Sequence, residues 1–186
     1  NIDLRTMATQ EIPGDEAILE VFIPDRNQKF DLVLNQVAYF YRGLSVVKSV
    51  KSSGACEVNV ICSEGDNWRD QIRGVAKITM KLGVPGSEAT YMCSGSLVNN
   101  IAQNCTPYFL TADHCSVSTV GGVDYPVTST QLSQWTFRFN YQATTCSGTY
   151  SGASQLYTGA TYKASDTYGE TSSGSDFFLC QLNNTP

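Results

Sequence analysis

Charged residues are scarce in this sequence, and long apolar runs are absent from it. Asp, Glu, Lys and Arg make up 16% of the 186 residues, whereas about a quarter is typical of soluble domains. The 12 Lys and Arg residues form no cluster and the net charge is −5, so the chain lacks the basic surface that binds nucleic acid or an anionic membrane. No apolar run approaches the roughly 20 residues that span a bilayer. We therefore expect neither nucleic acid nor a membrane as a partner.

Histidine is nearly absent as well, since His114 is the only one. The cysteines lack the C-x2-C pairs of zinc modules, and we expect no metal and no cofactor. Seven cysteines are instead typical of disulfides formed in an oxidising compartment, and their odd number leaves one sulfur without a partner inside the chain. The chain opens with Asn1 and not with a charged and then apolar leader, so we expect any signal peptide to have been removed already. The cysteines are Cys56, Cys62, Cys93, Cys105, Cys115, Cys146 and Cys180.

Short strand candidates recur between turn signals through most of the chain. Turns are indicated by pairs such as Pro85-Gly86, Asn99-Asn100 and Gly121-Gly122. No amphipathic helical period holds for three turns. This pattern predicts an all-β barrel or sandwich. The strand candidates are residues 58–61, 74–80, 91–98, 108–112, 135–141, 155–157, 160–163 and 176–182.

The first 50 residues contain no cysteine and are predicted to form a small β-rich region of their own. Residues 17–23 are a run of β-forming residues that stops at Pro24-Asp25, residues 30–34 alternate between apolar and polar, and residues 37–41 are apolar and aromatic. Residues 48–55 are small and basic, as in an exposed linker where proteolysis concentrates. We therefore place a boundary between residues 1–51 and residues 52–186.

His114 follows an apolar strand candidate and directly precedes Cys115. A lone histidine is most often a solvated or hydrogen-bonded structural residue. These flanks favour a second interpretation, because a general base needs a rigid strand that ends at the base and a covalent tie beyond it. Cys115 supplies that tie if it pairs with Cys93. In the chain-entropy argument a loop of that size contributes roughly 3 kcal/mol.

Two segments around His114 carry a family resemblance. CSGSLVNN at residues 93–100 and YFLTADHC at residues 108–115 resemble the histidine signature of trypsin-like serine proteases, most of all the bacterial lysyl endopeptidases. The resemblance covers residues 56–186, and residues 1–50 match more weakly as the pro-segment of that family. It implies a secreted, bacterial protein whose fold is the N-terminal β-barrel of a trypsin-like double barrel, preceded by a small β-rich pro-segment. Further matching segments are CEVNVIC at 56–62, EGD at 64–66, RDQIRGVA at 69–76, SDFFL at 175–179 and LNN at 182–184.

The same resemblance implies roles for individual residues. His114 is expected to be the general base, and Asp176 the buried carboxylate that orients it. On its own Asp176 reads as a turn residue after Gly174, and only the apolar run behind it and its match to the family favour the catalytic role. Asp113 matches a variable position of the family and is expected to face solvent.

The nucleophile of the family is missing from this sequence. No Gly-x-Ser-Gly-Gly motif is present, and only ten residues follow Asp176, whereas the family serine lies many tens of residues further on. The chain is therefore expected to lack the C-terminal barrel, with its oxyanion hole and specificity pocket, and to be inactive alone. Its expected partners are a peptide or protein substrate and that missing barrel.

The resemblance also implies disulfide pairings. It pairs Cys93 with Cys115 and Cys62 with Cys146, and it ties Cys56 to a cysteine in the absent half. A free thiol at Cys56 is the alternative. Cys105 and Cys180 lie outside the family pattern, and we expect them to pair with each other.

Several interpretations stay open. The leading one is a portion of a secreted serine endopeptidase that cleaves after basic residues and whose pro-segment is removed at Lys48 or Lys51; incidental lysines in a flexible linker explain those two residues equally well. A catalytically inactive homologue that acts as a secreted binding module is the main alternative. A disulfide-stapled structural domain, or a metal site built from His114 and nearby cysteines, fits the sequence less well.

Overall fold

The computed structural model describes residues 8–12, 14–25, 27, 29–39, 57–148, 154–166 and 174–186. The chain divides into two units, one of Asn1–Gln10 with Ser53–Pro186 and one of Glu11–Ser52. The larger unit is mostly β, with four short helical segments among its described residues. In chain order the elements are η1 (Ser63–Trp68), α1 (Arg69–Arg73), β1 (Val75–Leu82), β2 (Ala89–Val98), β3 (Tyr108–Ala112), η2 (Asp113–Ser116), β4 (Val117–Val120), β5 (Val123–Pro126), α2 (Ser129–Leu132), β6 (Thr136–Phe139), β7 (Gln155–Thr158), β8 (Ala160–Asp166) and β9 (Phe177–Leu182).

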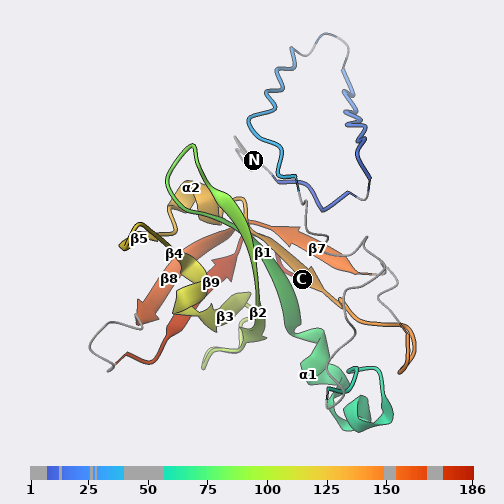
Figure 1. The fold of residues 1–186 in the computed structure, drawn as a ribbon. Helices are drawn as coiled ribbons and strands as arrows, with labels where there is room; N and C mark the ends of the chain where they lie inside the picture. Colours follow the sequence, from blue (N-terminus) through green and yellow to red (C-terminus); the bar gives the residue numbers. More distant parts are fainter. Residues whose placement is uncertain are drawn as a thin grey trace. The chain divides into compact units, whose positions relative to one another are not determined.

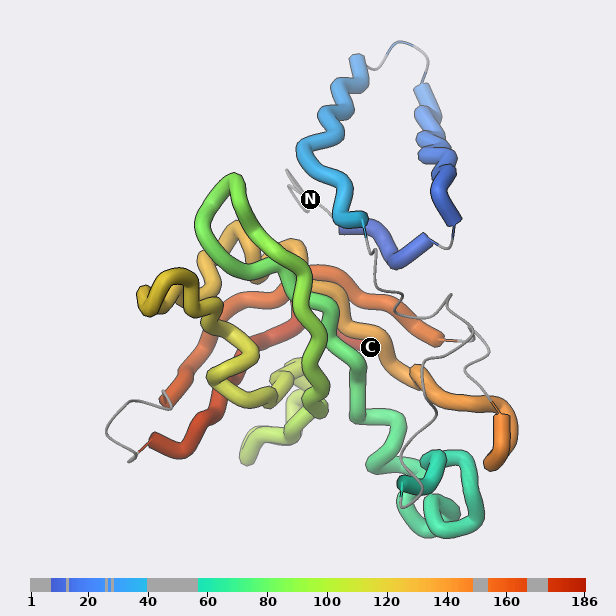
Figure 2. The backbone as a smooth tube through the Cα atoms, viewed as in Figure 1, coloured from blue at the N-terminus to red at the C-terminus, as the bar shows by residue number. Residues whose placement is uncertain are grey.

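Seven of the described strands form one curled antiparallel sheet in the order β7-β6-β1-β2-β3-β9-β8 (Figure 1). The two edge strands, β7 and β8, are consecutive in the chain and are separated only by Gly159. Figure 2 shows them as one continuous run of backbone that crosses the molecule. Since Gly159 also donates to Trp135 O and accepts from Asn183 N, the corner joins β6, β7 and β8 to the end of β9. The sheet therefore curls until its two edges meet in the chain, as in an all-β barrel.

The barrel interior follows from alternation along the strands. In β1 every second side chain is buried, and in β9 the same period buries Phe178, Cys180 and Leu182. Aromatic rings fill the centre, with Phe109 and Phe137 in edge contact at a centroid distance of 5.0 Å. The apolar period of two thus determines which face of each strand turns inward. The buried residues of β1 are Ala76, Ile78, Met80 and Leu82.

The Gly159 corner yields a stability prediction. Gly159 has φ 80°, and an added Cβ would lie 2.5 Å from Asn183 Nδ2 and 2.8 Å from the backbone oxygen of Ser133. We expect Gly159→Ala to lower the free energy of unfolding by about 1 to 2 kcal/mol for the left-handed backbone, with a further ~1–3 kcal/mol for overpacking. Urea unfolding measures both. Gly86→Ala is the control, since its φ is 86° with nothing within 4 Å; equal losses in the two variants would contradict the crowded corner.

The strand predictions for the larger unit agree with the structure except at two places. Residues 58–61 form no strand and lead through a turn into η1. Arg69, the first residue of α1, donates to the carbonyl oxygens of Val60, Ile61 and Cys62. The β4–β5 hairpin was not predicted as strands, although its turn at Gly121-Gly122 was. Both glycines have positive φ, which suits a two-residue hairpin turn. Its Ser and Thr residues lack the apolar alternation on which strand prediction depends.

The strands predicted for residues 17–23 and 30–34 are not formed, and the described part of 37–41, residues 37–39, is not a strand either. All described residues from 14 to 39 are exposed; Ile18, for example, is 94% exposed and Phe22 87%. β propensity measures how well a side chain fits a half-buried pleated surface, and here no such surface covers these side chains. The β-rich character expected for residues 1–51 is thus wrong for the residues that the structure describes. In all the parts of the chain that the structure describes, no helix is long and apolar enough to cross a membrane.

Candidate active site

His114 lies where the chain leaves the sheet. β3 ends at Ala112, and the short helix η2 carries His114 between that strand end and Cys115. Cys115 is bonded to Cys93 on β2, the strand that pairs with β3, so the disulfide ties η2 covalently to the sheet. The side chain of His114 is 67% exposed. A covalently anchored turn therefore presents the imidazole to solvent.

Asp176 meets His114 through the pairing of β3 with β9. Ala112 lies opposite Phe177 in the register, which brings the residue before β9 to the start of η2. The backbone N–H of Asp113 donates to the carbonyl oxygen of Asp176 at 3.1 Å. Asp176 itself has φ 51°, a left-handed conformation that Asp tolerates better than most residues. This backbone turn aims the carboxylate at His114.

Both oxygens of the Asp176 carboxylate are engaged by His114. The backbone N–H of His114 donates to Oδ1 at 2.9 Å, and imidazole Nδ1 lies 2.7 Å from Oδ2. The hydrogen bond from the His114 backbone N–H, followed by the bond and charge of the imidazole, lowers the pKa of Asp176. An ionised carboxylate accepts only, so the proton of a neutral imidazole resides on Nδ1 and Nε2 keeps its lone pair. Among the described residues, no hydroxyl group donates to that lone pair.

Asp176 is less buried than expected. Its side chain is 27% exposed, because it lies in the turn before β9 and not among the inward-facing side chains of the barrel. The carboxylate nevertheless has a fixed orientation, since two donors from one residue hold both oxygens.

Asp113 corrects a second expectation, because it does not face solvent. Its side chain is 4% exposed, and the hydroxyl of Ser116 donates to its carbonyl oxygen at 2.8 Å and to Oδ1 at 3.3 Å. The first turn of η2 folds this side chain inward, while the neighbouring His114 points outward. Burial raises the pKa of Asp113, the Ser116 hydrogen bond opposes that effect, and the negative charge of Asp176 adds to it.

The raised pKa of Asp113 predicts that replacing this carboxyl by a neutral group raises the thermal stability in a pH-dependent way. Burial holds the folded pKa of Asp113 above its usual range, so ionising this carboxyl lowers stability as the pH rises through the folded pKa, and the loss is complete above it. We expect Asp113→Asn to raise Tm at pH 7 by about 2 to 4 °C and to bring no gain at pH 3. Thermal unfolding at both pH values tests this, with exposed Asp124→Asn as the control. A gain of equal size at pH 3 would contradict the charge argument.

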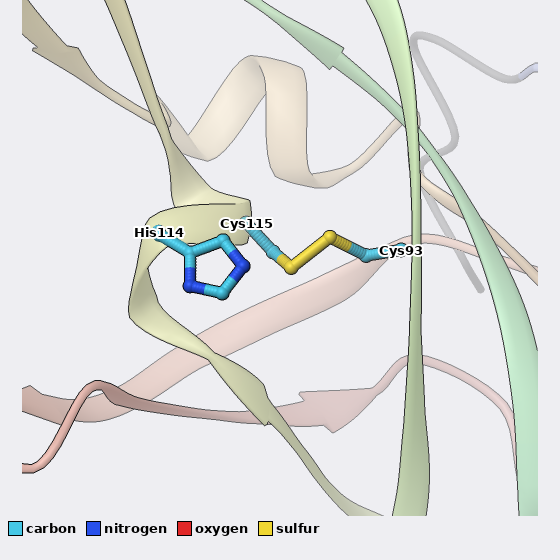
Figure 3. A group of neighbouring side chains, drawn as sticks. All are labelled: Cys93, His114 and Cys115. Carbon is cyan, nitrogen blue, oxygen red and sulfur yellow. A yellow bond between two sulfur atoms is a disulfide. The ribbon is translucent and has the colours of Figure 1, made fainter.

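A metal site of His114 with Cys93 and Cys115 does not fit the structure. The three side chains do gather, with their potential ligand atoms within 4.8 Å of one another. Figure 3 shows, however, that the two sulfur atoms are bonded to each other beside the imidazole. A metal is bound by thiolates and not by a disulfide, so the cluster offers it one imidazole alone.

The structure forms both disulfides that the resemblance implied, Cys93–Cys115 and Cys62–Cys146. The pairing expected between Cys105 and Cys180 is wrong, and both are free. Cys180 points into the core from β9 and is 0% exposed, whereas Cys105 lies in an exposed loop, so their sulfurs face different environments. Burial raises the pKa of the Cys180 thiol to about 12. Cys56, Lys48 and Lys51 lie outside the described residues.

One neighbour of the candidate site, Asp166, was not predicted from the sequence. Asp166, at the end of β8, accepts hydrogen bonds from the backbone N–H and the hydroxyl of Ser175. Asp166 belongs to the polar stretch 144–175, which reads as exposed loops, and no motif marks it. Only the pairing of β8 with β9 brings it to the site.

Comparison with known proteins places the chain in a family. The family described as "Lysyl endopeptidase, C-terminal domain" matches residues 50–186. The chain belongs to this family. A lysyl endopeptidase of Pseudomonas aeruginosa is 28% identical over an alignment of 183 residues, which covers 94% of this chain and 37% of that protein. The chain thus spans little more than a third of the relative that it matches, and its β-rich larger unit is an all-β barrel of a protease family.

Proposed function

We propose that this chain supplies the histidine and aspartate of a secreted serine endopeptidase, and that a second barrel, outside this sequence, supplies the serine. The observation that carries the proposal is that Asp176 makes two hydrogen bonds to His114, one with its backbone N–H at 2.9 Å and one with Nδ1 at 2.7 Å. A carboxylate that only capped a turn would need the backbone bond alone. The second bond orients the ring and selects its tautomer, which is what a general base requires.

In the proposed reaction His114 Nε2 accepts the proton of the serine hydroxyl as its oxygen attacks the carbonyl carbon of a peptide bond. The imidazolium then returns that proton to the leaving amine, and the carbon–nitrogen bond breaks to leave an acyl-serine. Water then attacks the acyl carbon and gives one proton to His114, which passes a proton to the serine oxygen as the acyl–serine bond breaks and the acid is released. Asp176 stays ionised throughout and stabilises the imidazolium.

The proposed substrates are peptides or proteins cleaved after lysine, a preference that rests on the name of the family. The two disulfides favour an oxidising compartment, in keeping with secretion. We further propose that residues 1–51 are a pro-segment released at Lys48 or Lys51, because the family match begins at residue 50.

The first experiment is to express the native gene and determine the intact mass of the secreted protein under non-reducing conditions. A species longer than this chain by a domain, with a serine that reacts with a fluorophosphonate probe, supports the proposal. Hydrolysis of matched lysine, arginine and leucine peptide substrates then tests the preference. A native product that ends at Pro186 and never reacts with the probe would overturn the proposed endopeptidase function and favour the inactive homologue that acts as a binding module.

A further inference from the structure

The turn that presents Asp176 is held from outside by a third carboxylate, that of Asp166. Its Oδ2 accepts from the backbone N–H of Ser175 at 2.9 Å and from the Ser175 hydroxyl at 2.8 Å. These two bonds lower the pKa of Asp166, the backbone bond first. Asp166, Ser175, Asp176 and His114 therefore form one continuous series of contacts that ends at the imidazole.

The position of Asp166 depends on an irregularity in β8. Asp166 lies opposite Phe177 of β9, and the register between the two strands shifts between Tyr162 and Ala164. One extra residue in β8 at this bulge changes which residues at the end of β8 lie opposite the start of β9. Bulges are common next to active sites, where they re-aim a side chain. Here the shift aligns Asp166 with the turn that precedes Phe177.

The turn itself has few other restraints. Residues 174–176 belong to no helix or strand, and Asp176 adopts the left-handed φ of 51°. The Asp113 N–H holds the carbonyl oxygen of Asp176 on one side, and Asp166 holds Ser175 on the other. With the second anchor removed, the backbone around Asp176 has more conformations available, and only some keep Oδ2 within reach of Nδ1.

We propose that Asp166 is a positioning residue for the proposed catalytic pair: through Ser175 it fixes Asp176 in the orientation that binds Nδ1 of His114. The inference rests on the proposed function for its catalytic consequence, but not for its structural one. A residue that merely stabilised the fold would, when replaced, change unfolding and leave the His114–Asp176 hydrogen bond intact. Asp166 is exposed, so its replacement is expected to leave the barrel folded.

The test uses the fact that His114 is the only histidine, since one imidazole gives one unambiguous set of NMR signals in the 186-residue chain. We expect Asp166→Ala to speed exchange of the Nδ1 proton with water about tenfold, the equivalent of losing roughly 1.4 kcal/mol of hydrogen-bond protection. Ser175→Ala, which keeps the backbone bond, should give a smaller change in the same direction. Asp166→Asn, which keeps one acceptor oxygen, should rescue part of the loss.

Asp124→Ala is the matched control, because Asp124 is also exposed and accepts from a hydroxyl, that of Thr119 at 2.6 Å, on the β4–β5 hairpin. It should leave the His114 signals unchanged. Unaltered Nδ1 exchange in both folded Asp166→Ala and Ser175→Ala would overturn the proposal, as would an equal effect of Asp124→Ala.

In the complete protease, Asp166→Ala should lower kcat about tenfold to 100-fold with little change in KM, since misplacing a catalytic group by about 1 Å has an effect of that order. Two failures are distinguishable. If the wild-type protein never hydrolyses peptides but Asp166→Ala still alters Nδ1 exchange, the proposed function fails and the positioning role stands. If the protease is active and Asp166→Ala changes neither exchange nor kcat, the positioning role fails.

Discussion

In the complete protease His114→Ala is expected to lower kcat about 10⁶-fold, the loss found when a triad base is removed. The replacement removes the only imidazole in the chain, and with it the group proposed to take the serine proton. Labelling of the serine by a fluorophosphonate should disappear as well, because an unactivated hydroxyl reacts poorly. The measurement is kcat for a lysine peptide substrate, together with the extent of labelling.

The fold is expected to survive that change. The His114 side chain is 67% exposed, and the disulfide beside it keeps η2 attached to β2. Unchanged far-UV circular dichroism and an unchanged count of free thiols serve as the controls. A folded His114→Ala variant that still hydrolyses peptides at the wild-type rate would show that the imidazole is not the base.

Replacing Asp176 by Asn is expected to lower kcat about 10⁴-fold through the wrong imidazole tautomer. A carboxylate only accepts at Nδ1, whereas an amide NH₂ can donate there and drive the proton to Nε2. His114 would then offer an N–H where the serine proton has to arrive. Nitrogen NMR shifts of the single histidine in the 186-residue chain report the tautomer directly, and kinetics of the complete protease report the loss of activity.

Asp176→Asn also has a control within the site. Asp113→Asn changes the neighbouring aspartate, which accepts hydrogen bonds from the hydroxyl of Ser116, and should keep the proton on Nδ1. An Asp176→Asn protein with the proton still on Nδ1 would contradict the orienting role, whatever its activity.

The sequence predicted the barrel strands well where burial alternates within one strand. β1, β3 and β9 all lie where the apolar period indicated. The same rule failed in residues 17–23 and 30–34, whose side chains have the right composition and are nevertheless exposed. A strand needs a partner and a surface to cover, and local composition reports neither.

The residues of the candidate site were visible in the sequence, but their neighbours were not. His114 stands out through its flanking strand and cysteine, and Asp176 through the segment around it. Asp113 was expected in solvent and is buried, since the direction of a side chain in a single helical turn is decided by what packs against it. The free state of Cys105 and Cys180 was missed for the same reason, because pairing depends on where the fold puts the two sulfurs, and Cys180 is buried whereas Cys105 is exposed.

The sequence by itself determined the all-β class and singled out His114, because each depends on a pattern read within a few residues, while the family resemblance implied the two disulfides that the structure forms. The family resemblance named Asp176 as the carboxylate that meets His114, but only the tertiary structure decided how it reaches the imidazole and that Asp166 holds the residue before it. Asp113 is its neighbour in the chain, yet Asp176, 62 residues away, forms the hydrogen bond. The pairing of β3 with β9 and the bulge in β8 bring Asp176 and Asp166 to that point, and strand register is a property of the whole folded sheet.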